Sequence, residues 1–141
     1  MIRRLVVGVR DSSSSRAALR WAAERARLTA AELLVVTAVP VPVPVVGPPG
    51  PVIIPDLDRY RLAAQRQLRT IVDDALGDGE RPTIVQRVGW GNPYRVLRDV
   101  SSDADVVVLG SGRHWRSGRL VRRCRRLLGC PVVVVDQGRP E

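Results

Sequence analysis

The stretch that decides the fold is RLVVGVRDSSSSRAALRWAAERA, residues 4–26. It opens on the apolar run Leu5 to Val9, and this run predicts a β-strand over Ile2 to Val9 that is buried on both faces. Four serines follow at positions 12–15, and serine is a preferred residue at the N-cap of a helix. Apolar residues then recur at helical spacing as far as Leu28, which predicts an amphipathic helix. A buried strand that leads directly into a helix is the start of an α/β fold.

The rest of the chain repeats this alternation. Further strands are predicted at Glu32–Val39, Thr83–Val88, Ala104–Gly110 and Cys130–Asp136, and further helices at Asp56–Leu76, from Asn92 to about Ser101, and after Gly118. The length of 141 residues is typical of one domain. We therefore expect a single α/β domain over residues 1–141, with a five-stranded parallel sheet and helices on both faces.

Two segments fall outside this pattern. Residues Pro40 to Pro55 include seven prolines among sixteen residues, which excludes a helix or a central strand and predicts an extended loop. This loop is either a surface connection of polyproline character or a segment whose valines and isoleucines pack on a partner. The tail, residues 137–141, contains no apolar anchor, so we expect it to be flexible.

The positive charge of the chain comes entirely from arginine. There are 23 arginines and no lysine, the net charge is +9, and seven arginines lie between Arg113 and Arg126. Exclusive use of arginine is often a habit of genomic base composition, whereas a local cluster attracts phosphates and other anions. The spacing of Arg119, Arg122, Arg123 and Arg126 predicts a basic stripe on the last helix. This stripe lacks interleaved aromatic residues and a known nucleic-acid module, so nucleic acid is not the predicted partner.

The two cysteines, Cys124 and Cys130, match neither a redox pair nor a zinc-ligand pattern, and they favour a reduced, cytoplasmic protein. Cys124 shares the apolar side of its helix, which favours a role in core packing. The first apolar run is interrupted by Gly8 and stops at Arg10, so it is too short for a signal peptide. No run is long enough to cross a membrane as a helix.

Three predicted strands end in residues suited to a binding site. These ends are Val9, Arg10 and Asp11; Ala38 and Val39; and Gly110, Ser111 and Gly112. Because parallel strands end at one edge of the sheet, we expect these residues to converge there. Glycines at such a turn let backbone N–H groups approach a phosphate, although a strand-to-helix turn also uses glycine for purely steric reasons. His114, the only histidine, has no residue that would orient it, so catalysis is not predicted.

The chain resembles the universal stress protein family over nearly its whole length. The resemblance is carried by residues 4–26 quoted above, by VGWGNPYRVLRDVSSDADVVVLGS at 88–111 and by CPVVVVD at 130–136. It implies a five-stranded parallel sheet, a cytoplasmic location and a homodimer formed through the last strand, here Pro131 to Val135. Many members bind ATP, so the resemblance also implies an adenine nucleotide as the cofactor to consider.

The sequence departs from the ATP-binding branch of that family. That branch ends its first strand on an acidic residue and continues after its fourth strand with the glycine pattern G-x2-G-x9-G-[ST]. Here Arg10 stands in the acidic position, with Asp11 next to it, and Arg113 stands in place of the second glycine. Gly118 and Arg119 align with the last glycine and its Ser or Thr, which makes the phosphate loop roughly five residues shorter.

These departures favour a non-catalytic regulatory or binding protein of the stress response that does not bind ATP in the usual mode. Two alternatives remain open. In one, the shortened site still binds an adenine nucleotide and hydrolyses it weakly, with Asp11 as the metal-binding carboxylate. In the other, the arginines bind a different anionic small molecule or act as an anion-binding interaction module.

Overall fold

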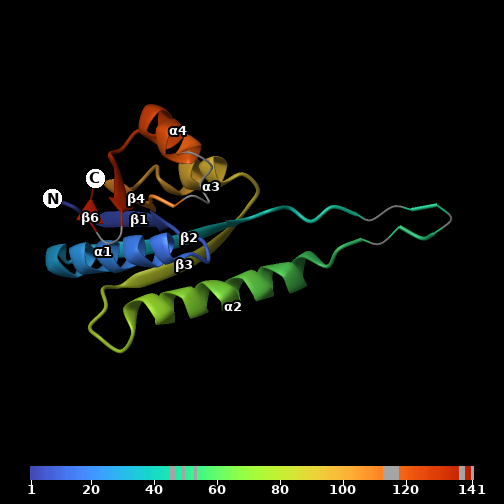
Figure 1. The fold of residues 1–141 in the computed structure, drawn as a ribbon, viewed down its shortest axis with the longest axis horizontal. Helices are drawn as coiled ribbons and strands as arrows, with labels where there is room; N and C mark the ends of the chain where they lie inside the picture. The colour runs from blue at the N-terminus through green and yellow to red at the C-terminus, as the bar shows by residue number, and fades with distance from the viewer. Residues whose placement is uncertain (45–46, 49, 53, 113–117, 137–138, 141) are drawn as a thin grey trace.

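The computed structural model describes residues 1–44, 47–48, 50–52, 54–112, 118–136 and 139–140. The elements run in the order β1 (Arg4–Gly8), α1 (Ser13–Thr29), β2 (Glu32–Val39), α2 (Leu57–Leu76), β3 (Ile84–Trp90), α3 (Pro93–Val100), β4 (Val106–Gly110), α4 (Arg119–Leu127), β5 (Val132–Asp136) and β6 (Arg139–Pro140) (Figure 1). Strands and helices alternate as far as β5, as the sequence predicted. The fold is therefore the predicted α/β fold with helices on both faces of a parallel sheet.

The strands form one sheet in the order β3-β2-β1-β4-β5-β6, and β1 to β5 are parallel. The order reverses between β1 and β4, because the chain moves outward from β1 to β3 on one side and from β4 to β6 on the other. In open α/β sheets, the crevice at such a switch point is the usual place for a ligand. The expected site residues at the ends of β1 and β4 lie at this point.

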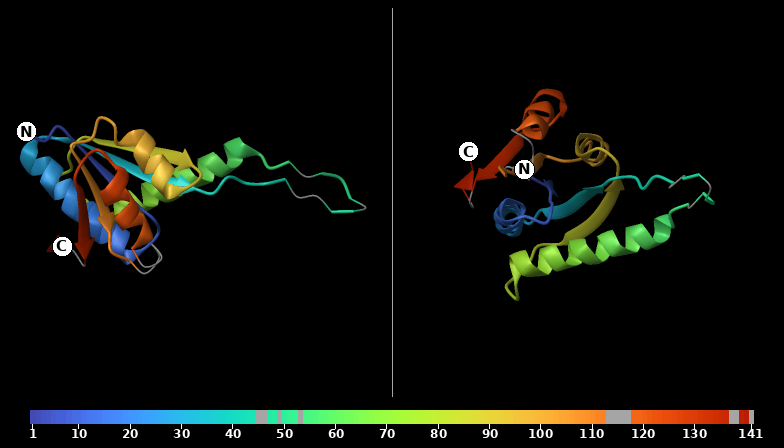
Figure 2. Two further views of the ribbon diagram at one scale, coloured as in Figure 1. Left: turned by 90° about the horizontal axis from the view of Figure 1, so that it is seen from above. Right: turned by 45° about the vertical axis from the view of Figure 1, so that its right-hand side comes forward.

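The two faces of the sheet are covered by different helices (Figure 2). Leu5, Val7 and Val35 pack with side chains of α1 and α2 in one apolar cluster. Val6, Leu34 and Val36 face the other way and pack with side chains of α3 and α4 in a second cluster. Because side chains alternate along a strand, an apolar run such as LVV supplies both clusters at once.

The helices begin where the sequence predicts. Ser12, Asp56 and Asn92 are the N-caps of α1, α2 and α3, and each side chain accepts a hydrogen bond from a backbone N–H group of the first turn. Pro93 occupies the first turn of α3, where a missing N–H group costs nothing. Strand ends are less well predicted. The strand predicted at Thr83–Val88 runs instead from Ile84 to Trp90, and Trp90 pairs with Val39 of β2.

The tail differs from the expectation of five strands followed by an unstructured end. Arg139 and Pro140 form β6, which pairs antiparallel with Val135 and Asp136 of β5. The prediction considered only apolar anchors, whereas an edge strand is held by backbone hydrogen bonds that need no apolar side chain. The sheet therefore contains a short sixth strand.

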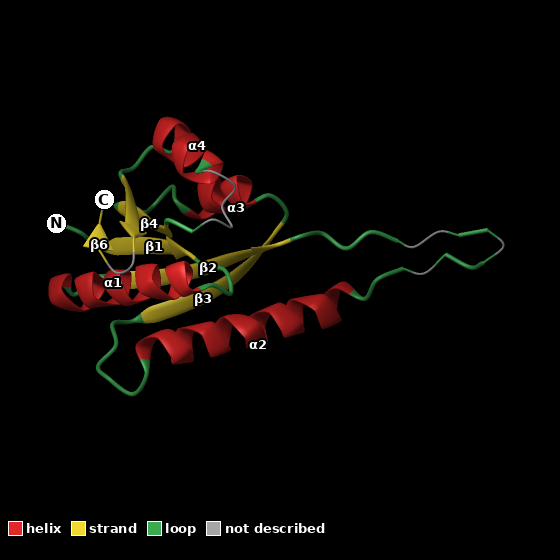
Figure 3. Cartoon of the chain, viewed as in Figure 1, coloured by secondary structure: helices red, strands yellow, loops and turns green. Residues whose placement is uncertain are grey.

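The proline-rich segment projects from the body of the molecule (Figures 1 and 3). The described residues between Pro40 and Pro55 lie in neither helix nor strand, and a backbone hydrogen bond from Gly50 to the carbonyl of Gly47 closes a turn in its outer part. The segment joins the end of β2 to the start of α2. It therefore leaves the sheet at the carboxyl ends of the strands, where the candidate site lies.

Candidate functional site at the switch point

The backbone at the end of β1 is fixed by neighbouring elements. The N–H group of Val9 donates to the carbonyl of Val36 at 2.9 Å, and the carbonyl of Val9 accepts from Oγ1 of Thr37 at 3.0 Å. The N–H group of Arg10 donates to Oγ of Ser15 at 2.9 Å, and Ser15 is fully buried. The turn from β1 into α1 is therefore held by a buried serine of α1 and by β2.

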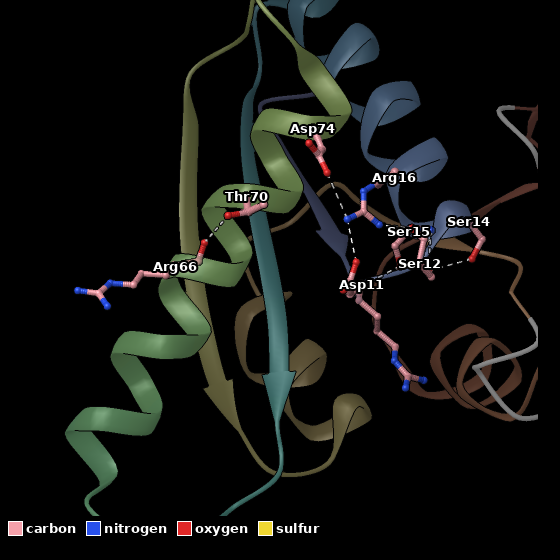
Figure 4. Close-up of polar contacts among 9 residues, drawn as sticks. Asp11, Ser12, Ser14, Ser15, Arg16, Arg66, Thr70 and Asp74 are labelled. Atoms are coloured by element: carbon pink, nitrogen blue, oxygen red, sulfur yellow. Dashed lines mark hydrogen bonds and ion pairs between the residues drawn. The ribbon is translucent and has the colours of Figure 1, made fainter.

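Asp11 forms an ion pair with Arg16 on the α1 and α2 side of the sheet (Figure 4). Its carboxylate lies 2.8 Å from the guanidinium of Arg16, which also lies 3.6 Å from the carboxylate of Asp74 in α2. Arg16 further donates to the carbonyl of Ser12 at 3.2 Å. This arrangement ties the β1–α1 turn to α2, so Asp11 already has a cationic partner.

Gly110, at the end of β4, lies against the first turn of α1. A Cβ atom added at Gly110 would come within 2.6 Å of the carbonyl oxygen of Ser14 and 2.8 Å of its carbonyl carbon. The neighbouring N–H group of Ser111 donates to the carbonyl of Val135 at 3.0 Å. The absence of a side chain at position 110 is therefore required by helix packing, which is the steric alternative raised by the sequence.

The structure brings most of the expected strand ends together. Val7 of β1 pairs with Val108 of β4. Two residues further along both strands, this register places Val9 beside Gly110. On the other side of β1, Ala38 and Val39 lie at the same edge but pair with Gly89 and Trp90 of β3, and the N–H group of Gly91 donates to the carbonyl of Val39. Ser111 and Gly112 are half-buried just beyond β4.

Gly118 and Arg119 begin α4, on the opposite face of the sheet from α1. Gly118 is the N-cap in the left-handed conformation, with φ of 75°, and makes no side-chain capping bond; Arg119 is exposed. Glycine adopts this conformation without the steric cost that other residues incur. Arg113, another expected site residue, and His114 lie outside the described residues, in the gap at 113–117.

Sequence reasoning did not identify the partners of Asp11. The short spacing of Asp11 and Arg16 across a predicted N-cap could have suggested their ion pair. The contribution of Asp74 could not have been found in this way, because α2 joins the pair only through tertiary packing.

Cys124 is buried among apolar side chains of the second cluster, as the sequence favoured. Burial raises the pKa of its thiol to about 11, with a further increase from Cys130 and an opposing decrease from Arg123. The guanidinium of Arg123 lies 4.1 Å from the ring centre of Tyr94, at cation–π distance. Cys124 is thus a packing residue rather than a reactive thiol at neutral pH.

Comparison with known proteins identifies the family. The model of the universal stress protein family matches residues 1–136. This chain belongs to that family. A universal stress protein of Mycolicibacterium smegmatis is 32% identical over 120 residues, which covers 83% of this chain and 40% of the relative. The chain thus spans less than half the length of that relative.

Solved structures of the family share the fold. A universal stress protein in complex with cAMP superposes with a TM-score of 0.67 at 22% identity, over 96% of this chain and 98% of that one. A universal stress protein of Archaeoglobus fulgidus in complex with dAMP superposes with a TM-score of 0.63 at 23% identity, over 95% and 98%. Within the part of the chain that the structure describes, no helix has the length and apolar character needed to cross a membrane.

Proposed function

We propose that this domain is a non-catalytic regulatory protein of the stress response, cytoplasmic, whose site does not hold ATP in the manner of the ATP-binding branch of the family. The observation that carries the proposal is the end of β1. Arg10 occupies the position of the acidic residue, and the adjacent carboxylate of Asp11 pairs with Arg16 at 2.8 Å. A carboxylate accepts hydrogen bonds from ribose hydroxyls, whereas a guanidinium only donates them.

Gly110 gives no independent support for a phosphate cradle. The space beside its Cα is filled by the backbone of Ser14, so this glycine is needed whether or not a nucleotide binds. The loop that follows is roughly five residues shorter than in the ATP-binding branch and offers fewer N–H groups to a triphosphate. ATP hydrolysis would in addition have to draw Asp11 away from Arg16 to bind a metal ion.

The second candidate is an adenine-nucleotide-binding protein with an altered site. It is favoured by α4, which begins at Gly118 without a side-chain cap and carries an exposed arginine, Arg119, as its first residue. The first N–H groups of a helix and an arginine suit a phosphate group. Two structures with the same fold are described as complexes with cAMP and dAMP, ligands that carry one phosphate.

Calorimetric titration separates the two candidates. Purified protein is titrated with ATP·Mg, AMP and cAMP at two salt concentrations, in the native chain and in the variants Arg10→Asp, Arg119→Ala and Arg126→Ala. The proposal expects no saturable heat at micromolar ATP·Mg in the native chain, and a gain of ATP affinity in Arg10→Asp because the missing carboxylate is restored.

Micromolar binding of a nucleotide to the native chain would overturn the proposal. If that binding weakens at least about tenfold in Arg119→Ala but not in Arg126→Ala, the second candidate replaces it. Arg126 is the matched control because it is also an exposed arginine, in the last turn of α4. If nucleotide binding weakens equally in both variants and also weakens at high salt, the binding is a non-specific attraction of anions to the arginine stripe.

We further propose a homodimer through the edge of β5, Pro131 to Val135. The contact has to share this edge with β6, because Val135 and Asp136 already pair with Pro140 and Arg139. A partner strand can therefore add beside Pro131 to Val134, or it must displace β6. The cross-linking experiment described below tests this contact with Pro131→Cys.

A further inference from the structure

A long arm projects from the end of β2, directly after the candidate site residues Ala38 and Val39. We define the arm as the described residues between Pro40 and Pro55 together with the first turns of α2, residues 57–63 (Figures 1 and 3). Every residue of α2 from Leu57 to Ala63 is exposed, and the first buried residue of the helix is Ala64. The arm thus packs little of its surface against the body of its own chain.

Apolar side chains gather on this arm. Among the described residues, seven of the eleven large hydrophobic side chains that are exposed belong to it: Val41, Val43, Val52, Ile54, Leu57, Tyr60 and Leu62. Their exposed fractions range from 47% to 78%. Scattered exposed apolar residues are normal, but a concentration on one projection indicates a surface that contacts another molecule.

The charge distribution of the arm suits a second copy of this chain. The chain carries a net charge of +9, which opposes self-association, yet residues 40–55 contain no charged side chain. The charged side chains of the arm, Asp58, Arg59 and Arg61, all lie in its helical part. A two-fold contact between antiparallel arms that crosses near Ile54 therefore places the uncharged segments of the two copies against each other.

We propose that the arm is a surface through which two copies of this chain associate. The seven exposed residues offer at most on the order of 700 Å² of surface per copy, slightly below the roughly 800 Å² per partner of a standard protein interface. The prolines remove backbone N–H groups and limit the conformations of the free arm. The contact therefore rests on apolar packing rather than on strand pairing, and ordering the arm costs little entropy.

The first test is sedimentation of the full chain over a range of micromolar concentrations. Because a β5 dimer leaves both arms free, the native chain is expected to form a reversible assembly larger than that dimer. Val43→Asp combined with Ile54→Asp places charges on the arm and is expected to weaken this further association at least about tenfold. Leu28→Asp is the matched control, because Leu28 is 64% exposed on α1, outside the arm, and its change should leave the association intact.

The second test locates the contact by disulfide cross-linking. Single cysteines are introduced as Ile54→Cys, Pro131→Cys and Leu28→Cys in a Cys130→Ser background, where the remaining Cys124 is fully buried. The arm contact predicts rapid cross-linking at position 54 and none at position 28. Since all three positions are on the surface, circular dichroism is expected to show a native fold in each variant.

Three results would overturn the proposal. The native chain could remain monomeric at all concentrations, or the arm variant could associate as strongly as the control. Cross-linking at position 131 without cross-linking at 54 would place the interface at β5 instead, which supports the edge-strand dimer and removes the arm contact.

Discussion

Gly110 illustrates how a residue that resembles a ligand-binding element can have a structural cause. A glycine after an apolar strand suggests a phosphate cradle in sequence, but here the backbone of Ser14 occupies the space of the missing side chain. The contact is visible only once α1 is packed across the end of β4. The same limit applies to Arg16 of α1, which pairs with Asp11 in the preceding turn and also with Asp74 of α2.

Gly110→Ala is therefore expected to destabilise the protein by about 1–3 kcal/mol, because its Cβ would force α1 away from β4. Gly129→Ala is the control, since a Cβ there would meet nothing within 4 Å. Urea denaturation of the three proteins measures the difference. Equal midpoints for Gly110→Ala and Gly129→Ala would show that α1 can shift without cost.

At the scale of elements, the serines that open α1 have distinct roles. The sequence predicts an N-cap somewhere in residues 12–15 but does not choose among them. In the structure Ser12 is the cap, and its hydroxyl accepts from the N–H group of Ser15 at 3.1 Å. Ser15 is buried and accepts from the N–H group of Arg10. The position of β1 therefore decides which serine caps the helix and which one is buried against the β1–α1 turn.

Ser12→Ala is expected to lower the free energy of unfolding by about 1 kcal/mol, because a first-turn N–H group loses its side-chain acceptor. Ser13→Ala removes an exposed hydroxyl inside the first turn and should change stability little. Thermal and urea denaturation compare both variants with the native chain. A Ser13→Ala change as large as that of Ser12→Ala would contradict the assignment of the cap.

At the scale of the whole molecule, Asp105 joins the start of β4 to the start of β1. Its carboxylate accepts from the N–H groups of Arg3 at 2.7 Å and Arg4 at 3.0 Å, across about a hundred residues of sequence. The hydrogen bond from Arg3 and then that from Arg4 lower the pKa of this carboxyl group, against a smaller opposing effect of burial. The folded state therefore favours the ionised form of the Asp105 carboxyl group.

The pH dependence of stability follows from the direction of this shift. Because the pKa of Asp105 is lower in the folded chain, its contribution is complete above the ordinary pKa of an aspartate and is lost as the pH falls through the folded value. Asp105→Asn should remove that part of the acid dependence while leaving the fold intact. Denaturation midpoints from neutral to acidic pH in both proteins measure it, and parallel curves would refute the role of Asp105.

The sequence by itself determined the alternation of strands and helices, the cores of the five parallel strands, the cap of α3 at Asn92 and the family. These features depend on local patterns: apolar runs, helical spacing and capping residues. Tertiary structure decided the ion pair of Arg16 with Asp74, the steric role of Gly110, the length of β3 and the pairing of β6. Each of these depends on which distant backbone lies within a few ångströms, and no local pattern encodes that distance.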